Sequence, residues 1–210
     1  MSIIDKALGA ITPPESEAVR AKATAMARAM SEPGDWLSLV LDHHQQINEA
    51  FEEGCKAMAP ASRLEAMQKL ARVLIGHSLG EEIVLYPALA KAGHKGMTSL
   101  AYTEQTTAKM QMAELERIDP ATQDWLDKWE HIRGAVLHHA YEEERIWFPK
   151  LKQDYRDQAF LTRRFREEFE RYVDGADRQQ AAGGDGHAEE RSFEPQPARD
   201  LGPGDQAIVQ

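Results

Sequence analysis

One pattern, present twice, constrains this chain more than any other feature. It reads His, three residues, Glu-Glu, four residues, Pro, and runs from His77 to Pro87 and from His139 to Pro149, with an aromatic residue before each proline. Residues four apart lie one above the other on a helix, so the histidine and first glutamate of each copy share a face. Burying both groups on that face is costly unless they find partners. The fold must therefore leave these pairs in water or supply a partner for them.

The sequence around both copies has helical periodicity. Apolar residues recur three and four apart over long segments, and alternating strand patterns are absent. We expect Pro87 to end the helix that carries the first copy, and Gly76, Gly80 and Gly134 to weaken the segments that contain them. The predicted helices cover about residues 16–30, 36–57, 62–85, 97–118, 121–148 and 157–173.

These helices predict an all-α fold built on an up-down-up-down four-helix bundle, because short connections make neighbouring helices antiparallel. Residues 1–35 form an N-terminal arm with its own helix, 36–151 the bundle and 152–174 an extra C-terminal helix. Residues 175–210 are predicted to be a disordered tail, because they contain too few large apolar residues to offset the entropy of ordering. The sequence names no protein partner for this tail.

Composition narrows the classes of function. The 210 residues carry a formal net charge of −10, which disfavours nucleic acid and anionic membrane surfaces as partners. Cys55 is the single cysteine, so no internal disulfide can form. We find no signal-peptide pattern and no apolar run approaching the ~18 residues of a membrane helix. The expected location is therefore the cytoplasm.

The histidines and glutamates of the repeat fall on the apolar stripes of their helices. His44 lies on the apolar stripe of the first core helix. The same separation that joins His44 to His77, counted back from His139, leads to Gln105 or its neighbour Thr106, and Gln105 is the one that lies on a stripe. The chain thus resembles one helical hairpin used twice. A lone His-x-x-x-Glu pair is usually a surface pair, but two inward-facing copies favour a metal pair, for which imidazole and carboxylate are suitable ligands.

Other polar residues near the repeat are given ordinary roles. Glu142 and Glu144 are expected to form a solvated face, and His43 a surface, packing or hydrogen-bonding position. His131 lies about 12 Å along the helix axis from His139, too far to share its metal.

At these residues the sequence resembles the hemerythrin-like, or HHE cation-binding, domain. The run from Asp42 to Ile47, with Phe51 beyond it, is similar to that family's opening motif, and the two repeats are similar to its second- and fourth-helix ligand motifs. The resemblance covers about residues 36–151. It implies two iron ions, with an oxo-bridged pair as one form, although zinc and manganese stay open. It assigns bridging roles to two glutamates and terminal roles to three histidines, namely Glu81, Glu143, His44, His77 and His139.

The chain departs from the family at Gln105, where the resemblance calls for a histidine. Gln105 could coordinate weakly and leave an open position, Glu104 could rotate in as an anionic substitute, or the second metal could bind loosely. A site with fewer imidazoles favours reaction with O₂, NO or peroxide over simple oxygen transport. The expected function is a non-haem di-iron protein that senses, binds or handles these small molecules, or buffers iron. The alternatives are a di-iron oxidase or peroxide-consuming enzyme, and a metal-free or zinc-stabilised helical interaction protein.

Overall fold

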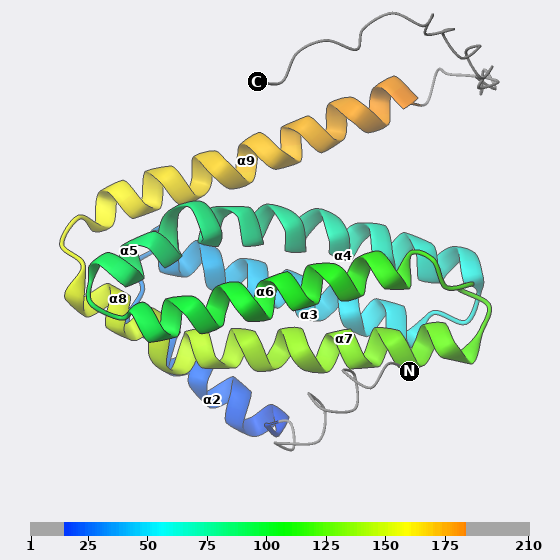
Figure 1. Ribbon diagram of the computed structural model, residues 1–210, viewed down its shortest axis with the longest axis horizontal. Helices are drawn as coiled ribbons and strands as arrows, with labels where there is room; N and C mark the ends of the chain where they lie inside the picture. The colour runs from blue at the N-terminus through cyan, green and yellow to red at the C-terminus, as the bar shows by residue number, and fades with distance from the viewer. Residues whose placement is uncertain (1–14, 184–210) are drawn as a thin grey trace, which may run out of the picture.

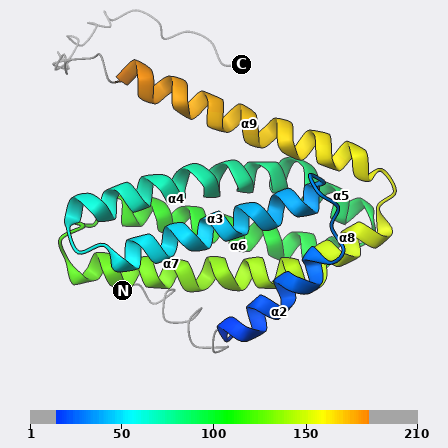
Figure 2. The same ribbon diagram turned by 180° about the vertical axis from the view of Figure 1, so that it is seen from behind.

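The chain is helical in the part that the computed structural model describes, residues 15–183, and no strand occurs in that range (Figure 1). The long helices lie side by side as a bundle, as predicted (Figures 1 and 2). Its elements are α2 (Glu17–Arg28), α3 (Trp36–Lys56), α4 (Pro60–Gly80), the π-helical turn η1 (Glu81–Leu85), α5 (Tyr86–Lys91), α6 (Lys95–Leu115), α7 (Gln123–Glu142), the π-helical turn η2 (Glu143–Trp147), α8 (Phe148–Asp154) and α9 (Gln158–Gly183).

Local signals set where the core helices begin. Asp35 caps α3, because its carboxylate accepts from the backbone N–H of Ser38 at 2.7 Å. Thr122 caps α7, and Pro60 opens α4 at a position where a missing N–H does no harm. In the bundle, α3 packs against α4 and α7, and α6 packs against α7.

The expectation that Pro87 ends its helix is wrong. The helix continues through Pro87 to Lys91, and the matching helix continues through Pro149 to Asp154. A proline lacks an N–H and its ring crowds the preceding turn, so an α-helix cannot pass through it undisturbed. A wider π-helical turn precedes each proline and absorbs the disturbance. In these turns the N–H of Tyr86 donates to the carbonyl of Glu81, five residues back, and the N–H of Phe148 donates to Glu143.

A polar layer separates two apolar clusters in the bundle. One cluster includes Trp36, Leu41 and Phe148, and the other includes Ile47, Phe51 and Trp129, with every one of these side chains buried. Helix α3 shows the alternation directly, since its buried stripe passes from Leu41 through His44 to Ile47. The predicted stripes are therefore confirmed as the buried faces, and their polar members meet between the clusters.

Helix α9 covers the outer side of α4 and α3 (Figures 1 and 2). Its Phe169 ring stacks on His43 with centroids 3.9 Å apart, which gives His43 a packing role. Two glycines of α4 make the close approach possible, because an added Cβ would lie 2.8 Å from Phe165 at Gly80 and 3.0 Å from Tyr172 at Gly76. Gly76 and Gly80 thus leave room for the aromatic side chains of α9.

The predicted boundary between the C-terminal helix and the tail is wrong. Residue 152 belongs to α8, and α9 begins at Gln158 and continues past residue 174 to Gly183. Arg72 of α4 donates to Asp177 at 2.7 Å, so contact with the bundle extends beyond the predicted end. Residues 184–210, the rest of the predicted tail, lie outside the described part, as do residues 1–14 of the arm. Within residues 15–183, no helix has the length and apolarity needed to cross a membrane.

Candidate metal centre

Four buried side chains converge in the polar layer between the two apolar clusters. One ligand atom each from His44, His77, Glu81 and Glu143 lies within 4.8 Å of all the others. Both glutamates have no exposed surface, and both histidines are buried. They come from α3, α4 and the first residues of the two π-helical turns. All four are residues that the sequence predicted as ligands.

Glu143 lies between two histidines. Its Oε2 atom is 3.3 Å from Nε2 of His44, and its Oε1 atom is 3.3 Å from Nε2 of His139. A carboxylate with one imidazole at each oxygen offers a cation a mixed set of imidazole and carboxylate ligands. The structure thereby brings the predicted ligand His139 to the cluster through Glu143.

Glu81 also has different neighbours at its two oxygens. Its Oε1 atom is 3.1 Å from Nε2 of His77, its partner in the repeat. Its Oε2 atom accepts hydrogen bonds from the Tyr86 hydroxyl, at 3.2 Å, and from the Gln105 amide. Glu81 therefore links the His77 side of the site to the Gln105 side.

The sequence reasoning missed Tyr86, which lies at the middle of the site. This fully buried hydroxyl is 2.8 Å from Glu143 Oε1 and 3.0 Å from Nε2 of His139. The aromatic residue before each proline was a visible signal, and the second copy has Phe148 there, without a hydroxyl. That difference between the copies could have indicated a polar role for Tyr86.

Gln105 and Glu104 occupy different places. Gln105 is buried, and its Nε2 atom donates to Glu81 and, at 2.7 Å, to the Tyr86 oxygen. Its Oε1 atom has no hydrogen-bond partner among residues 15–183. Glu104 lies outside the cluster, with Oε2 2.8 Å from Nδ1 of His139, the ring nitrogen that does not face Glu143. In this structure Glu104 orients His139, while Gln105 faces the site itself.

The expectation that Glu144 lies on a solvated face is wrong, because its carboxylate contacts a site histidine from outside the cluster, as that of Glu104 does. This residue is buried rather than solvated, and its Oε1 atom is 2.8 Å from Nδ1 of His44. His44 and His139 each therefore have a carboxylate on the outer ring nitrogen and Glu143 on the inner one. Such partners fix the tautomer and orientation of a metal-binding imidazole.

Burial and mutual contact shift the pKa values of these groups in opposite directions. Burial disfavours charged His44, but Glu143 and Glu144 raise its pKa to about 10. Burial opposes the charge on Glu143 as well, yet His139 and His44 hold the pKa of Glu143 well below its usual range. Burial, followed by the neighbouring Glu143, raises the pKa of Glu81 well above its usual range. Burial disfavours charged His139 too, but Glu143 and Glu104 raise its pKa in the same way as that of His44. Without a metal, these directions favour a proton on Glu81 and protonated His44.

The residues present fit a metal cation. Among the described residues, Gln105 Oε1 is a buried oxygen without a hydrogen-bond donor, while Glu81 Oε1 and Glu143 Oε2 each face a histidine Nε2, at 3.1 and 3.3 Å. Buried acceptors of this kind are costly unless a cation or donor satisfies them. Metal ions take imidazole and carboxylate in their deprotonated forms, so a cation can replace the protons that the cluster holds.

A small cavity adjoins the cluster. Its volume is about 30 Å³, and its walls include His44, His77, Gln105 and His139 together with apolar side chains from four helices. The apolar part of the lining is Ile47, Leu74, Ala108, Ala135, Val136, Leu137 and Ala140. This space holds a molecule of about the size of water.

Comparisons with known proteins agree with this site. The sequence matches the family model of the hemerythrin HHE cation binding domain over residues 37–151. A curated relative named DNA nickase, from Nostoc sp. strain PCC 7120, is 25% identical over 111 residues, which is 53% of this chain and 32% of the relative. The chain thus spans about a third of that protein's length, and no solved structure matches it.

The family match includes every residue of the buried cluster and its neighbours Tyr86, Gln105 and Glu144. It leaves α2 and α9 outside. Because the match covers more than half of the chain, this protein belongs to the hemerythrin HHE cation-binding domain family.

Proposed function

We propose that this protein is a non-haem di-iron protein that senses, binds or handles O₂, NO or peroxide, or buffers iron. The observation that carries the proposal is the position of Glu143, which places one oxygen beside His44 and the other beside His139. A carboxylate placed in this way suits two metal ions rather than one. The proposal takes the bundle as up-down-up-down, the order that brings two His-x-x-x-Glu helices together at one site.

The two proposed metal positions are unequal. The first has the ligand atoms of His44, His77, Glu81 and Glu143, all within 4.8 Å of one another. The second has His139 and the remaining carboxylate oxygens, with Gln105 where the family resemblance calls for a histidine. An amide oxygen is a weaker ligand than imidazole, so we propose that the second ion binds less tightly and keeps an open position.

The adjoining cavity supports a small ligand. A pocket for an organic substrate usually has a volume of about 300–1,000 Å³, whereas this one has about 30 Å³. Diatomic gases and peroxide fit such a space, and its apolar walls limit the entry of bulk water. Iron supplies ligand coordination and one-electron redox chemistry, while the protein holds the ions, orients their histidines and restricts access.

One observation favours a peroxide-consuming enzyme as the second candidate. Near the weaker position, Tyr86, His139 and Glu104 form a chain of hydrogen-bonding groups from the buried site to a partly exposed carboxylate. Such a chain can move protons to or from a bound peroxide. Catalysed loss of peroxide would separate this candidate from a binding or sensing protein.

We do not extend the relative's printed activity to this chain. The alignment covers 32% of that protein, so its nicking activity can reside outside the shared part. A formal net charge of −10 also disfavours a polyanionic partner. We therefore propose no nucleic-acid role, no membrane role and a cytoplasmic location.

Elemental analysis combined with an absorption spectrum tests the proposal. Protein produced with iron available should contain about two irons per chain and show the near-ultraviolet bands of a bridged ferric pair. Titration with NO and peroxide would then identify the ligand. Zinc, a single metal or no metal in the wild-type protein would contradict the proposal and favour the structural bundle.

A further inference from the structure

The arm helix α2 contacts the proposed metal site through one buried carboxylate. Glu144 of η2 accepts from the Thr24 hydroxyl with Oε2, while its Oε1 atom is 2.8 Å from Nδ1 of His44. Glu144 is 5% exposed, and its two oxygens thus join α2 to α3. The arm helix lies outside residues 37–151, so the family match does not account for this contact.

The direction of the hydrogen bonds follows from the chemistry of the groups. An ionised carboxylate only accepts, so the single proton of the Thr24 hydroxyl points to Glu144. The alternative acceptor for that proton, the carbonyl of Arg20, lies 3.1 Å away on the same helix. The other carboxylate oxygen then accepts from His44 Nδ1–H, which leaves Nε2 of His44 directed at Glu143, 3.3 Å away.

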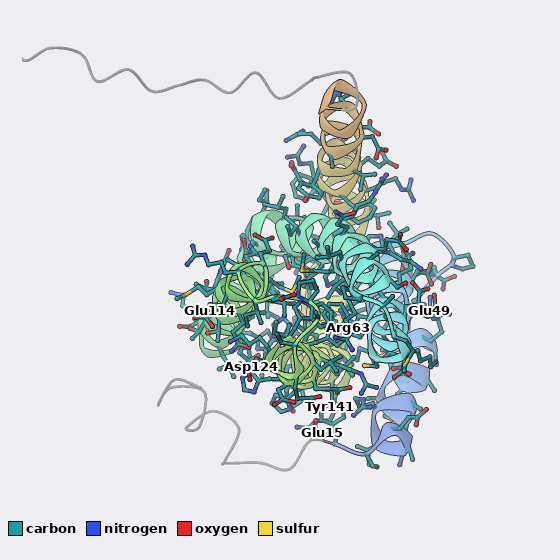
Figure 3. The ribbon with its side chains drawn as sticks, turned by 90° about the vertical axis from the view of Figure 1, so that its right-hand side faces the viewer. Glu15, Glu49, Arg63, Glu114, Asp124 and Tyr141 are labelled. Carbon is teal, nitrogen blue, oxygen red and sulfur yellow. The ribbon has the colours of Figure 1, made fainter. Side chains whose placement is uncertain are left out.

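Independent contacts hold α2 in place on both sides of Thr24. Just before the start of the helix, Glu15 Oε1 lies 3.1 Å from Nδ1 of His138 on α7, and Figure 3 shows Glu15 beside the bundle. Near the end, Arg28 pairs with Asp42 of α3 at 2.8 Å. Ala23 and Ala27 are buried against the bundle between these contacts. The position of the Thr24 hydroxyl is therefore fixed by the docking of the whole helix.

Helix α2 packs on η2, the turn that carries Glu144. A polar cavity of about 450 Å³ lies between α2, α3 and α7, and Thr24, Glu144 and His44 all contribute to its lining. A carboxylate open to this space would form hydrogen bonds with water and could adopt several rotamers. The hydroxyl of Thr24 removes that freedom. His139 offers a contrast, because its outer carboxylate Glu104 is 26% exposed and comes from the bundle itself.

We propose that Thr24 of the arm helix and Glu144 act together as positioning residues for His44, so that docking of α2 sets the affinity of one metal position. This inference rests on the proposed di-iron function. Glu144 fixes the tautomer and ring orientation of His44, and Thr24 fixes Glu144. Loss of an outer partner of a metal-binding histidine typically weakens metal binding by about 10–100-fold.

Substitutions at Thr24 test the inference with ferrous iron and a competing chelator. Thr24→Val keeps the shape of the side chain but removes the hydroxyl, and it should weaken the binding of one of the two ions by about tenfold. Glu144→Gln should weaken the binding of the same ion by at least as much. Thr24→Ser, which keeps the hydroxyl, should bind like the wild type. Thr107→Val is the matched control, since the Thr107 hydroxyl donates to the carbonyl of Thr103 on its own helix.

A second readout does not need metal. In the metal-free protein, the Nδ1 nuclear magnetic resonance signal of His44 should move in Thr24→Val and stay in place in Thr24→Ser and Thr107→Val. Circular dichroism will show whether each variant keeps its helices. Wild-type iron affinity together with an unmoved His44 signal in Thr24→Val and Glu144→Gln would overturn the inference.

The same measurements separate the two proposals. If the wild-type protein takes up no iron, the di-iron function fails, and the role of Thr24 in metal affinity fails with it. If the wild-type protein binds two irons but Thr24→Val has no effect on either, the di-iron function stands and only the role of the arm helix is wrong.

Discussion

At the scale of single residues, the ionisation of Glu81 and Glu143 sets the charge of the buried cluster. Both carboxylates are fully buried. Burial and the neighbouring Glu143 raise the pKa of Glu81, whereas His139 and His44 hold the pKa of Glu143 below its usual range. Protonated His44 supplies part of the compensating charge in the metal-free protein, and a bound cation can supply it instead. The same residues thus determine both the stability of the polar layer and its capacity for metal.

Removal of either carboxylate that we propose as a bridge should abolish binding of the proposed pair of ions. We expect Glu81→Ala and Glu143→Ala each to lose metal and to unfold at lower urea concentration than the iron-loaded wild type, because metal binding stabilises the folded state. His131→Ala should do neither. Metal analysis and urea unfolding measure both effects, and loss of metal in His131→Ala but not in His139→Ala would show that the assignment along α7 is wrong.

Tyr86→Phe isolates the hydroxyl that the sequence reasoning missed. It removes the group that lies within 3.2 Å of both carboxylates and of His139. Buried acceptors that lose a partner cost about 1–3 kcal/mol, so the metal-free variant should be less stable by that amount in urea.

Tyr102→Phe is the control for this prediction. Tyr102 lies on the protein surface and donates to the carbonyl of Glu82 at 2.7 Å. Its loss should change the free energy of unfolding by less than about 1 kcal/mol. Equal effects of the two substitutions would argue against a central role for the Tyr86 hydroxyl.

At the scale of secondary-structure elements, the two π-helical turns explain the repeat. Each begins at the inward glutamate, and each lets its helix continue through a proline. The wider turn also places two consecutive glutamates of η2, Glu143 and Glu144, in buried positions. In the first copy the corresponding second residue, Glu82, pairs with Lys109 at 2.7 Å nearer the surface. The same local pattern therefore serves different roles in its two copies.

The packing of α9 against α4 depends on glycine, which has no side chain, at the contact positions of α4. Gly80→Ala should destabilise the protein by about 1–3 kcal/mol, because its Cβ would lie 2.8 Å from the fully buried Phe165 ring. Gly134→Ala should be neutral or stabilising by up to about 1 kcal/mol, since an added Cβ meets nothing within 4 Å on α7. Thermal unfolding of both variants checks this, and a neutral Gly80→Ala would show that α9 can shift without cost.

At the scale of the whole molecule, the metal centre joins the two halves of the bundle. The four clustered side chains come from α3, α4 and η1 on one side and from η2 on the other, and His139 of α7 contacts the cluster through Glu143. The polar layer lies between two apolar clusters. Seen along the bundle, α9 stands on one side of the molecule and α2 on another (Figure 3). Both extensions cover the layer from outside the family domain.

Metal removal should therefore lower the stability of the entire chain. Saturation at 100 to 1,000 times the dissociation constant stabilises a folded protein by about 3–4 kcal/mol, which is roughly 5–15 °C in the unfolding midpoint for a chain of this size. Scanning calorimetry with iron and with a chelator measures the difference. Glu143→Ala should show no such response, and equal midpoints for the wild-type protein under both conditions would contradict the prediction.

The sequence by itself determined the approximate extent of the helices, their buried faces and the four side chains of the buried cluster. Helical periodicity is local, so the placement of His44, His77, Glu81 and Glu143 on apolar stripes follows from their spacing alone. The repeat and its flanking motif were sufficient to identify the family. The departure at Gln105 was visible for the same reason, since its position on a stripe requires no knowledge of its neighbours.

Only the tertiary structure decided which groups meet across helices. Glu144 is one residue from Glu143, and no periodicity distinguishes a solvated face from one that a separate arm helix covers. The Tyr86 hydroxyl, the Thr24 contact and the glycine surface under α9 all depend on chain segments far apart in sequence. Contacts of this kind form when apolar packing fixes the distances between helices, and that packing is a property of the folded chain as a whole.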